Sequence, residues 1–425
     1  MTSEREAMEN LVNQAESLLH AYQQDHVVRC MKELSVEEKQ KLAAQVLRVD
    51  FDQLAQAYLN RSTSSMGQGK HISPIPYFDV DTLSKEVYEQ YEERGLELLR
   101  DGKIGVIVVA GGQGSRLGHA GPKGTFDIGL PSHKSLFQLQ AERLLQLSLR
   151  VGRIIPWYLM TSPENHEDTV QFFESHQFFG YPAEDCFFLE QNTMPAMDHE
   201  GKLLLASPSE LHFAPSGNGE CFASFKRSGA LEDMEKRGLT WLFYYNVDNA
   251  LIQVADPVFI GMADLQHHPI ASKVVFKERP DEKVGMVCLW NQRPAIVEYT
   301  EFPEHVLNER NDRGDLAYAL ANISIHMFRY DFIAQHADTQ IPFHVASKAI
   351  PHMNAAREII VPDAPNGYKL ERFIFDFFPL AEAMTVLRVE REKEFAPVKN
   401  KEGEDSSLTA RNLVLRMYPE EGLSE

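Results

Sequence analysis

The sequence predicts an α/β protein with a mixed, mostly parallel sheet, because short apolar runs alternate with helical stretches through the middle of the chain. The runs are IGVIVVA (104–110), IIPWYLM (154–160), CFFLEQ (186–191) and WLFYYNVD (241–248). Each is apolar almost throughout, as strands buried on both faces of a parallel sheet are. Helical stretches near 135–150, 164–176 and 228–238 separate them. This alternation indicates a sheet covered by helices on both faces.

The chain before this region predicts helices. Apolar residues recur at helical spacing up to about residue 61, and Ser35 with Glu38 predicts a capping box that opens a helix running to Leu47. A loop rich in Ser, Gly and Pro follows at 62–78, and a further helix is expected over 81–100. We therefore expect a helical N-terminal region with its linker at 1–102.

The chain after about residue 271 predicts short strands, which we expect to be sheet extensions and hairpins over the carboxyl ends of the parallel strands. Ligands bind at that edge of α/β sheets. The charged stretch 392–406 predicts a surface loop, and a short helix is expected near 407–417. Together these features predict a central α/β domain at 103–390 and a C-terminal loop and helix at 391–425.

Composition limits the possible ligands. The 425 residues include 62 Asp and Glu but only 42 Lys and Arg, for a net charge of −20. A polyanion binds nucleic acid poorly, so we expect a small substrate whose phosphates are held by a few local cations. The four cysteines lack metal or redox spacing. Because neither a signal peptide nor an apolar run of about 18 residues is present, we expect a cytoplasmic protein without membrane contact.

A glycine-rich loop, VVAGGQGSRLGHAGPKG (108–124), directly follows the first buried strand. Its glycines allow backbone N–H groups to face an anion, and Arg116 and Lys123 add two positive charges. The spacing fits neither a Walker A loop nor the dinucleotide fingerprint, whose third glycine would fall on Leu117. The loop therefore predicts a phosphate site of another kind. Asp248, at the end of a later strand, is the best candidate ligand for Mg²⁺, which prefers carboxylate oxygen.

The sequence V-A-G-G-Q-G-S-R-L-G followed by P-K-G resembles the activation loop of the sugar-1-phosphate uridylyltransferases. It looks closest to the UDP-N-acetylhexosamine pyrophosphorylase group and its shorter bacterial relatives. The resemblance continues, in order, through PWYLMTS (156–162), FFLEQNTMPAM (187–197), GNG (217–219), NVDN (246–249), VADPVFIG (254–261), VEYTE (297–301), PNGYKLERFIFDFF (365–378) and EFAPVKN (394–400). It implies a GT-A-like Rossmann nucleotidyltransferase core, with 103–390 as the catalytic domain.

The resemblance also implies roles for single residues. Those implied in UTP binding are Ala110, Gly111, Gly112, Lys123, Gln191, Gly217, Asp248 and Lys369. Those implied in sugar binding are Asn218, Glu298, Tyr299, Asn322 and Lys399. Arg116, Lys123 and Lys399 are expected to be catalytic by neutralising phosphate charge. Asp248 and Asp376 are expected to bind Mg²⁺, although Asp376 equally fits a buried hydrogen-bond anchor.

The implied reaction is an in-line attack of a sugar-1-phosphate oxygen on the α-phosphorus of UTP, which yields a UDP-sugar and pyrophosphate. The implied sugar is an N-acetylhexosamine, and we expect a monomer or a weak homo-oligomer. Three alternatives stay open: a hexose-1-phosphate substrate, a UTP- or UDP-sugar-binding regulatory protein without turnover, and a glycosyltransferase. The glycosyltransferase is disfavoured because Asp248-Asn249 is not a full Asp-x-Asp. The regulatory protein is suggested by Glu220, which stands where the family usually has glycine.

Overall fold

The computed structural model describes residues 2–61, 71–299, 301–302, 304–354 and 356–422. The chain forms two compact units, and both are assembled from separate stretches of sequence. The first unit comprises Met1–Ser64, Asn192–Gly219 and Ile341–Phe373, and the second comprises Ser65–Gln191, Glu220–Gln340 and Ile374–Glu425. These units cross the boundaries expected at 102/103 and 390/391, which stay predictions. None of the helices that can be described is long and apolar enough to cross a membrane.

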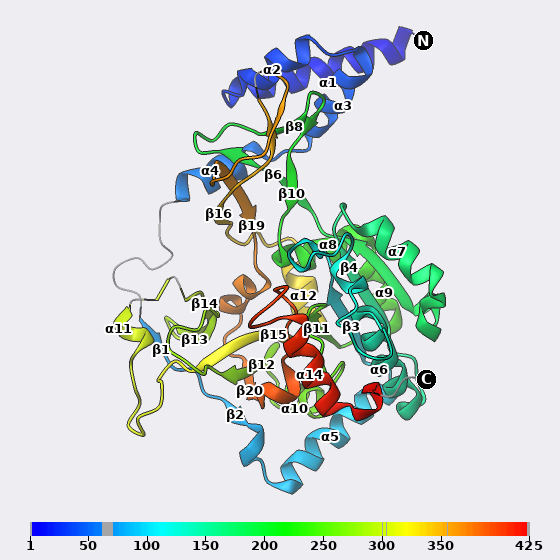
Figure 1. Cartoon of the computed structure of the whole chain (residues 1–425), viewed down its shortest axis with the longest axis vertical. Coiled ribbons are helices and arrows are strands. Elements are labelled where there is room, and N and C mark those ends of the chain that lie inside the picture. The colour runs from blue at the N-terminus through cyan, green and yellow to red at the C-terminus, as the bar shows by residue number, and fades with distance from the viewer. Residues whose placement is uncertain (1, 62–70, 300, 303, 355, 423–425) are drawn as a thin grey trace. The chain divides into compact units, whose positions relative to one another are not determined.

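The second unit is built on a mixed, mostly parallel sheet, as the sequence predicts (Figure 1). The main path of the sheet runs β2-β20-β12-β15-β11-β3-β4-β5. Its strands are β2 (Phe78–Asp79), β20 (Thr385–Arg388), β12 (Ile270–Phe276), β15 (Leu320–Arg329), β11 (Trp241–Asn246), β3 (Ile104–Val109), β4 (Trp157–Thr161) and β5 (Cys186–Glu190). β11, β3, β4 and β5 are parallel, so their carboxyl ends meet at one edge. β1 (Ile72–Ser73), β13 (Met286–Trp290) and β14 (Arg293–Val297) extend the sheet beside β15.

Helices cover both faces of this sheet. Successive side chains of a strand point to opposite faces, and in these strands both sets are apolar, so both faces have to be buried. On one face, Trp241, Phe243 and Tyr245 of β11 share a core with residues of α5 (Lys85–Arg100), α6 (Leu136–Val151) and α10 (Pro257–Leu265). On the other face, Tyr158 of β4 packs on Phe225 of α8 (Cys221–Ser228) and bonds to Asp233 of α9 (Ala230–Arg237). The remaining α-helices of this unit are α7 (His166–Ser175), α11 (Glu304–Leu307), α12 (Tyr330–His336), α13 (Arg391–Glu394) and α14 (Ser407–Met417).

The first unit combines helices with small sheets. Its helices are α1 (Thr2–Ala21), α2 (Asp25–Lys32), α3 (Val36–Leu47) and α4 (Phe51–Asn60), and α3 opens with the predicted Ser35–Glu38 capping box. Its strands are β6 (Thr193–Pro195), β7 (Met197–Asp198), β8 (Leu205–Ser207), β9 (Glu210–Leu211), β10 (Phe213–Pro215), β16 (His344–Lys348), β17 (His352–Met353), β18 (Ile359–Ile360) and β19 (Gly367–Glu371). Helices and strands share one apolar core, in which Leu42 of α3 lies with Leu203, Leu211 and Leu370.

Two predictions about late segments are confirmed only in part. β13 and β14 form an expected hairpin that extends the sheet, whereas β12 and β15 lie within its main path. The stretch 392–406 is not simply a surface loop, since Glu394, Ala396 and Val398 are buried. The expected loop at 62–78 lies partly outside the described residues. The helix expected near 407–417 is confirmed as α14.

Candidate active site

The glycine loop leaves β3 at the sheet edge where the four parallel strands end. Ala110 bonds through its N–H to the Met160 carbonyl of β4, which keeps the start of the loop in line with the sheet. The loop then folds back on itself: the Gly114 N–H donates to the Gly121 carbonyl, and the Lys123 N–H donates to the Gly112 carbonyl at 3.0 Å. Gly112 and Arg116 are exposed, and no ion pair or hydrogen bond of the Arg116 side chain is found within the described ranges. The loop therefore presents backbone and one cation to solvent.

Lys123 and Asp248 meet at this edge. The Lys123 Nζ donates to Asp248 Oδ2 at 2.9 Å, and the two side chains are 17% and 21% exposed. Lys123 comes from the return of the glycine loop, whereas Asp248 follows β11, which pairs with β3. The pairing of these strands explains why residues 125 positions apart contact each other. The pair places a partly exposed ammonium and a carboxylate side by side at the sheet edge.

Gln191 packs directly against the glycine loop. It follows β5, and its N–H donates to the Thr161 carbonyl at the end of β4. Its side-chain amide lies so close to Gly111 that a Cβ at position 111 would collide with Gln191 Nε2. A Cβ at position 111 would displace the end of the Gln191 side chain, so glycine at 111 permits this close approach. The structure brings the residue predicted to recognise the uracil edge next to the backbone predicted to bind the nucleotide.

Asn165 supports the glycine loop from behind, a role that the sequence did not reveal. Its Nδ2 donates to the Ala110 carbonyl at 2.9 Å and to the Gly112 carbonyl at 3.3 Å. Its Oδ1 accepts from the Ser162 N–H at 2.8 Å, and the residue is 1% exposed. These bonds hold two carbonyl groups of the loop toward Asn165. The sequence placed Asn165 inside the helical stretch expected at 164–176, and the structure makes it the N-cap residue of α7.

The segment that carries Lys399 runs alongside the Asp248 turn. The Val398 N–H donates to the Asp248 carbonyl at 2.9 Å, and the Ala250 N–H donates to the Ala396 carbonyl at 3.0 Å. Lys399 follows at once, and its Nζ lies 3.1 Å from Asp405 Oδ2. The Asp405 carbonyl also accepts from the N–H groups of Lys399 and Asn400. Asp405 therefore orients both the backbone and the cation of Lys399, which sequence reasoning did not anticipate.

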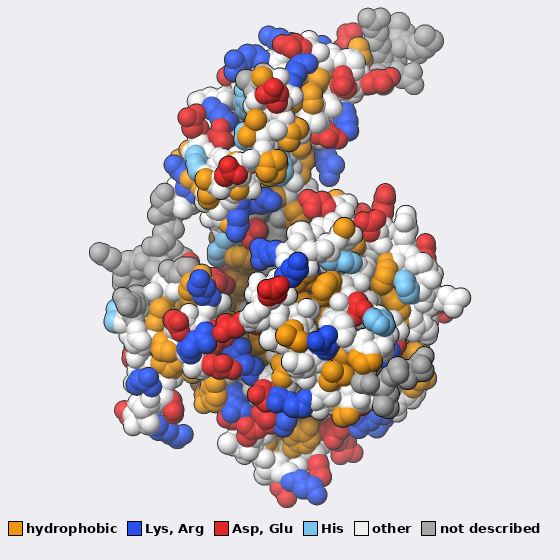
Figure 2. Space-filling model, viewed as in Figure 1, with side chains coloured by type: hydrophobic (Ala, Val, Ile, Leu, Met, Phe, Trp, Pro, Cys, Tyr) orange, Lys and Arg blue, Asp and Glu red, His pale blue; other side chains and the backbone are white. Residues whose placement is uncertain are grey.

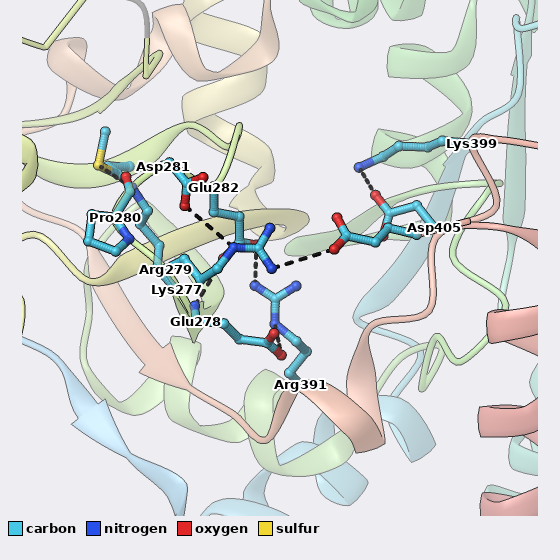
Figure 3. A network of polar contacts seen from close by, with 11 residues as sticks. Lys277, Glu278, Arg279, Pro280, Asp281, Glu282, Arg391, Lys399 and Asp405 are labelled. Atoms are coloured by element: carbon cyan, nitrogen blue, oxygen red, sulfur yellow. Dashed lines mark hydrogen bonds and ion pairs between the residues drawn. The ribbon is translucent and has the colours of Figure 1, made fainter. Parts of the chain in front are cut away.

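Lys399 lines a charged cleft of about 590 Å³ in the second unit, together with Asn322. Figure 3 shows Lys399 pointing toward Asp405, next to Arg279 and Arg391 with their acidic partners. Arg391 Nη2 lies 2.5 Å from Glu282, and Arg279 lies 3.5 Å from Glu404. The pair Arg279–Glu404 links the loop after β12 to the loop that follows Lys399. On the visible face, Figure 2 shows acidic and basic side chains interspersed over this unit.

Glu298 and Asn322 both lie next to Gly285. The Asn322 N–H donates to the Gly285 carbonyl at 2.9 Å, and a Cβ at position 285 would lie 3.2 Å from Glu298 Oε1. Asn322 Oδ1 accepts from the Ser324 N–H at 2.9 Å. Tyr299 packs against the small core formed around β13 and β14. Two of the predicted sugar-binding residues thus lie next to the same glycine, at the part of the sheet where β13 meets β15.

The predicted Mg²⁺ ligands differ in their surroundings. Asp248 Oδ2 is bonded to Lys123, and Asp248 Oδ1 has no partner within the described ranges. Asp376 lies half-buried in a 3₁₀ segment, Ile374–Leu380, that packs on β14. Across the described residues no group of three or more His, Cys, Asp or Glu side chains could hold a metal. Asp248 fits a cation that takes one protein carboxylate and completes its shell with phosphate and water, as Mg²⁺ does.

Three predicted residues belong to the first unit. Gly217 has φ +88°, and a Cβ there would collide with the Arg372 carbonyl, so this position requires glycine. Asn218 follows it, and the Gly219 N–H donates to the same carbonyl at 2.9 Å. Lys369 lies on β19 opposite Ala346 of β16. The pKa of His212 is lowered mainly because its side chain is partly buried, and the positive charge of Lys369 lowers it further. The ligand-binding roles predicted for these residues stay predictions.

Comparison with known proteins decides the family. The profile of the UTP–glucose-1-phosphate uridylyltransferase family (UDPGP) matches residues 49–414. The chain belongs to this family. The match includes the glycine loop, Asp248 and Lys399, which the geometry above places in one unit. The enzyme class predicted from the sequence, a uridylyltransferase, is therefore confirmed.

Individual members of the family resemble the chain over most of its length. It is 39% identical to UDP-N-acetylglucosamine diphosphorylase 2 of Arabidopsis thaliana, over 94% of this chain and 82% of that protein. It is 35% identical to the human UDP-N-acetylhexosamine pyrophosphorylase-like protein 1, over 93% of this chain and 82% of that protein. A crystal structure of the UDP-N-acetylglucosamine pyrophosphorylase of Trypanosoma brucei superposes with a TM-score of 0.82 at 29% identity, over 96% of this chain and 84% of that one. The predicted fold is confirmed.

Glu220, the residue that departs from the usual sequence of this family, is buried. It is 4% exposed at the N-cap of α8, and its Oε2 lies 3.9 Å from Arg227 of the same helix. A carboxylate at a helix N-terminus is stabilised by the helix dipole, and Arg227 adds a compensating charge. The environment of Glu220 thus accommodates its charge within the second unit.

Proposed function

We propose that the protein transfers uridylyl groups from UTP to a sugar-1-phosphate, forming a UDP-sugar and releasing pyrophosphate, with Mg²⁺ as cofactor. The observation that carries this proposal is the Lys123–Asp248 pair at 2.9 Å beside the glycine loop, with Gln191 packed on Gly111. The arrangement combines anion-binding backbone, a fixed cation, a carboxylate for a metal and an amide for a base. These are the parts that a nucleotidyl transfer needs.

The chemistry is a single displacement. An oxygen of the sugar-1-phosphate attacks the α-phosphorus of UTP, a new P–O bond forms, and the bond from the α-phosphorus to the bridging oxygen of pyrophosphate breaks. Lys123, Arg116 and Lys399 bind and neutralise phosphate oxygens, so that two anions can approach each other. Asp248 would hold Mg²⁺, which when bound supplies further neutralisation of the triphosphate. Gln191 orients the uracil with one donor and one acceptor.

We propose an N-acetylhexosamine-1-phosphate as the sugar substrate. Support comes from the relatives, since the two Arabidopsis proteins, each 39% identical, are named UDP-N-acetylglucosamine diphosphorylases. Glu298 and Asn322, which both lie next to Gly285, are the residues proposed to contact the sugar. A cytoplasmic location and a monomeric or weakly oligomeric state belong to the same proposal.

A pyrophosphate-release assay tests the proposal. Purified protein is mixed with UTP, Mg²⁺ and, separately, the 1-phosphates of N-acetylglucosamine, N-acetylgalactosamine, glucose and galactose, with EDTA, CTP and ATP as controls. Release that needs UTP and Mg²⁺ and prefers an N-acetylhexosamine is the expected result. Release with glucose- or galactose-1-phosphate alone would replace the sugar assignment. No release, with UTP still raising the melting temperature, would favour a binding protein without turnover.

A further inference from the structure

Asn249, the residue after Asp248, has both ends of its side-chain amide engaged by the backbone. Its Oδ1 accepts from the Leu251 N–H at 3.2 Å and from the Ala396 N–H at 3.0 Å. Its Nδ2 donates to the Glu394 carbonyl at 2.7 Å, and the residue is 2% exposed. An asparagine so placed is not a second metal ligand next to Asp248. Instead it joins the turn after β11 to a segment almost 150 positions later.

The backbone continues this connection in the direction of Lys399. Asn249 forms a bridge with Pro397, the Ala250 N–H bonds to Ala396, and the Val398 N–H bonds to the Asp248 carbonyl. Residues 394–398 therefore lie antiparallel to 248–250, and Lys399 is the first exposed residue after them. The position of the Lys399 backbone relative to Asp248 is set by these few bonds.

A buried ion cluster fixes the other side of the same segment. Lys273 of β12 is 0% exposed, and its Nζ lies 2.6 Å from Glu394 Oε1 and 2.7 Å from Asp256 Oδ2. Asp256 in turn caps α10 through the Val258 N–H. The start of the segment is thus tied to the sheet and to α10, and Asn249 connects it to the Asp248 turn.

We propose that Asn249 is a positioning residue, which fixes the segment carrying Lys399 against the turn carrying Asp248 and so sets the spacing of the two charges for transfer. The inference rests on the proposed function, because it assumes that Lys399 and Asp248 act on the same bound phosphates. Asn249 itself contacts neither substrate nor metal. Its substitution by alanine leaves the buried Ala396 and Leu251 N–H groups without their acceptor, which loosens the segment.

The test compares Asn249→Ala with Leu231→Ala, a buried position of α9 outside the site. For Asn249→Ala we expect kcat to fall at least about 10-fold, while the KM for UTP changes less, because misplacing a charge impairs the transition state more than binding. For Leu231→Ala we expect kcat near that of the wild type below its melting temperature. An unchanged kcat in Asn249→Ala would overturn the inference.

A double-mutant cycle and hydrogen exchange separate positioning from mere stabilisation. In a Lys399→Ala background, Asn249→Ala should lower kcat by less than about 3-fold, because the residue acts through Lys399. If Asn249→Ala lowered kcat by the same factor in the wild type and in Lys399→Ala, the inference would be contradicted. The amides of Phe395, Ala396 and Val398 should exchange faster in Asn249→Ala than in Leu231→Ala, and equal exchange would also overturn the inference. A wild-type protein without transferase activity would refute the proposed function. Amide hydrogen exchange would then still decide whether Asn249 anchors the segment 394–398.

Discussion

Lys123 is the single residue whose removal should cost the most activity, because it is the cation that the structure holds most firmly at the glycine loop. We expect Lys123→Ala to lower turnover at least about 100-fold, the usual effect of losing one fixed charge stabiliser. Lys134→Ala is a matched control, since Lys134 is also paired with carboxylates, Glu142 and Glu421, and is 22% exposed. Steady-state pyrophosphate release measures both variants. Equal turnover in the two would exclude the role of Lys123.

Asp248 should control the response to Mg²⁺. We expect Asp248→Asn to lower kcat at least about 100-fold and to raise the Mg²⁺ concentration needed for half-maximal rate, because a neutral amide binds a hard cation weakly. Asp264→Asn is the control: Asp264 is 23% exposed and pairs with Arg94 at 2.7 Å. Mg²⁺ titrations of both variants at saturating UTP give the comparison. A wild-type titration curve for Asp248→Asn would refute the metal assignment.

At the residue scale, the sequence predicted the groups that face a ligand better than the groups that support them. Asp248 and Gln191 come just after β11 and β5, and Lys123 lies in the glycine loop that follows β3, so their meeting at one sheet edge could be anticipated from the strand ends. Asn165 and Asn249 could not be assigned, because their amides bond to backbone 53 to 147 positions away and nothing local marks those partners. Asp405 is near Lys399 in sequence, but only the loop conformation brings its carboxylate to Nζ.

At the element scale, the sequence predicted most helices and strands but not their order in the sheet. The buried runs at 104–110 and 241–248 became β3 and β11, and helical periodicity located α6 and α9. Apolar pattern alone could not show that β15 lies between β12 and β11, since strand pairing is decided by contacts distant in sequence. Nor could charge composition show that α13 buries Glu394 against Lys273.

This buried cluster should make stability depend on pH. Burial raises the pKa of Glu394 to about 7, although Lys273 of β12 opposes the shift, and Asp256 beside α10 adds to it. Tyr88 of α5 also faces the cluster. Because the folded state binds this proton more tightly than the unfolded chain, the contribution is complete below about pH 4.5. It is then lost as the pH rises through about 7.

Glu394→Gln should remove this dependence. Between pH 5 and 8 we expect the free energy of unfolding of the wild type to fall relative to that of Glu394→Gln, by an amount on the order of 1–3 kcal/mol. Glu390→Gln, at a glutamate beside α13 whose side chain is 40% exposed and pairs with Lys393, should keep the wild-type slope. Urea unfolding at four pH values measures all three proteins. Parallel slopes for wild type and Glu394→Gln would show that Glu394 does not titrate in this range.

At the scale of the whole molecule, each compact unit has its own apolar core and is built from distant stretches of chain. In the first unit, α3 supports the strands of 192–219, because Leu42 shares their core and Gln45 Oε1 accepts from the Leu211 N–H at 2.8 Å. Gln24 Oε1 accepts from the Leu203 N–H at 2.9 Å in the same way. The N-terminal helices and these strands therefore depend on each other for burial, although about 150 residues separate them in sequence.

A cavity in α3 should therefore loosen strands far along the chain. We expect Leu42→Ala to destabilise the first unit by about 2–5 kcal/mol, the usual cost of emptying a buried leucine site. Amide exchange should accelerate in α3 and also at 203–211. Leu47→Ala is the control in the same helix, because Leu47 is 37% exposed.

The three tryptophans of the chain all lie in the second unit: Trp157, Trp241 and Trp290. Since that unit has a separate core, their fluorescence midpoint should stay unchanged in Leu42→Ala. If the fluorescence midpoint shifted together with the midpoint for unfolding of the first unit, the two cores would unfold as one.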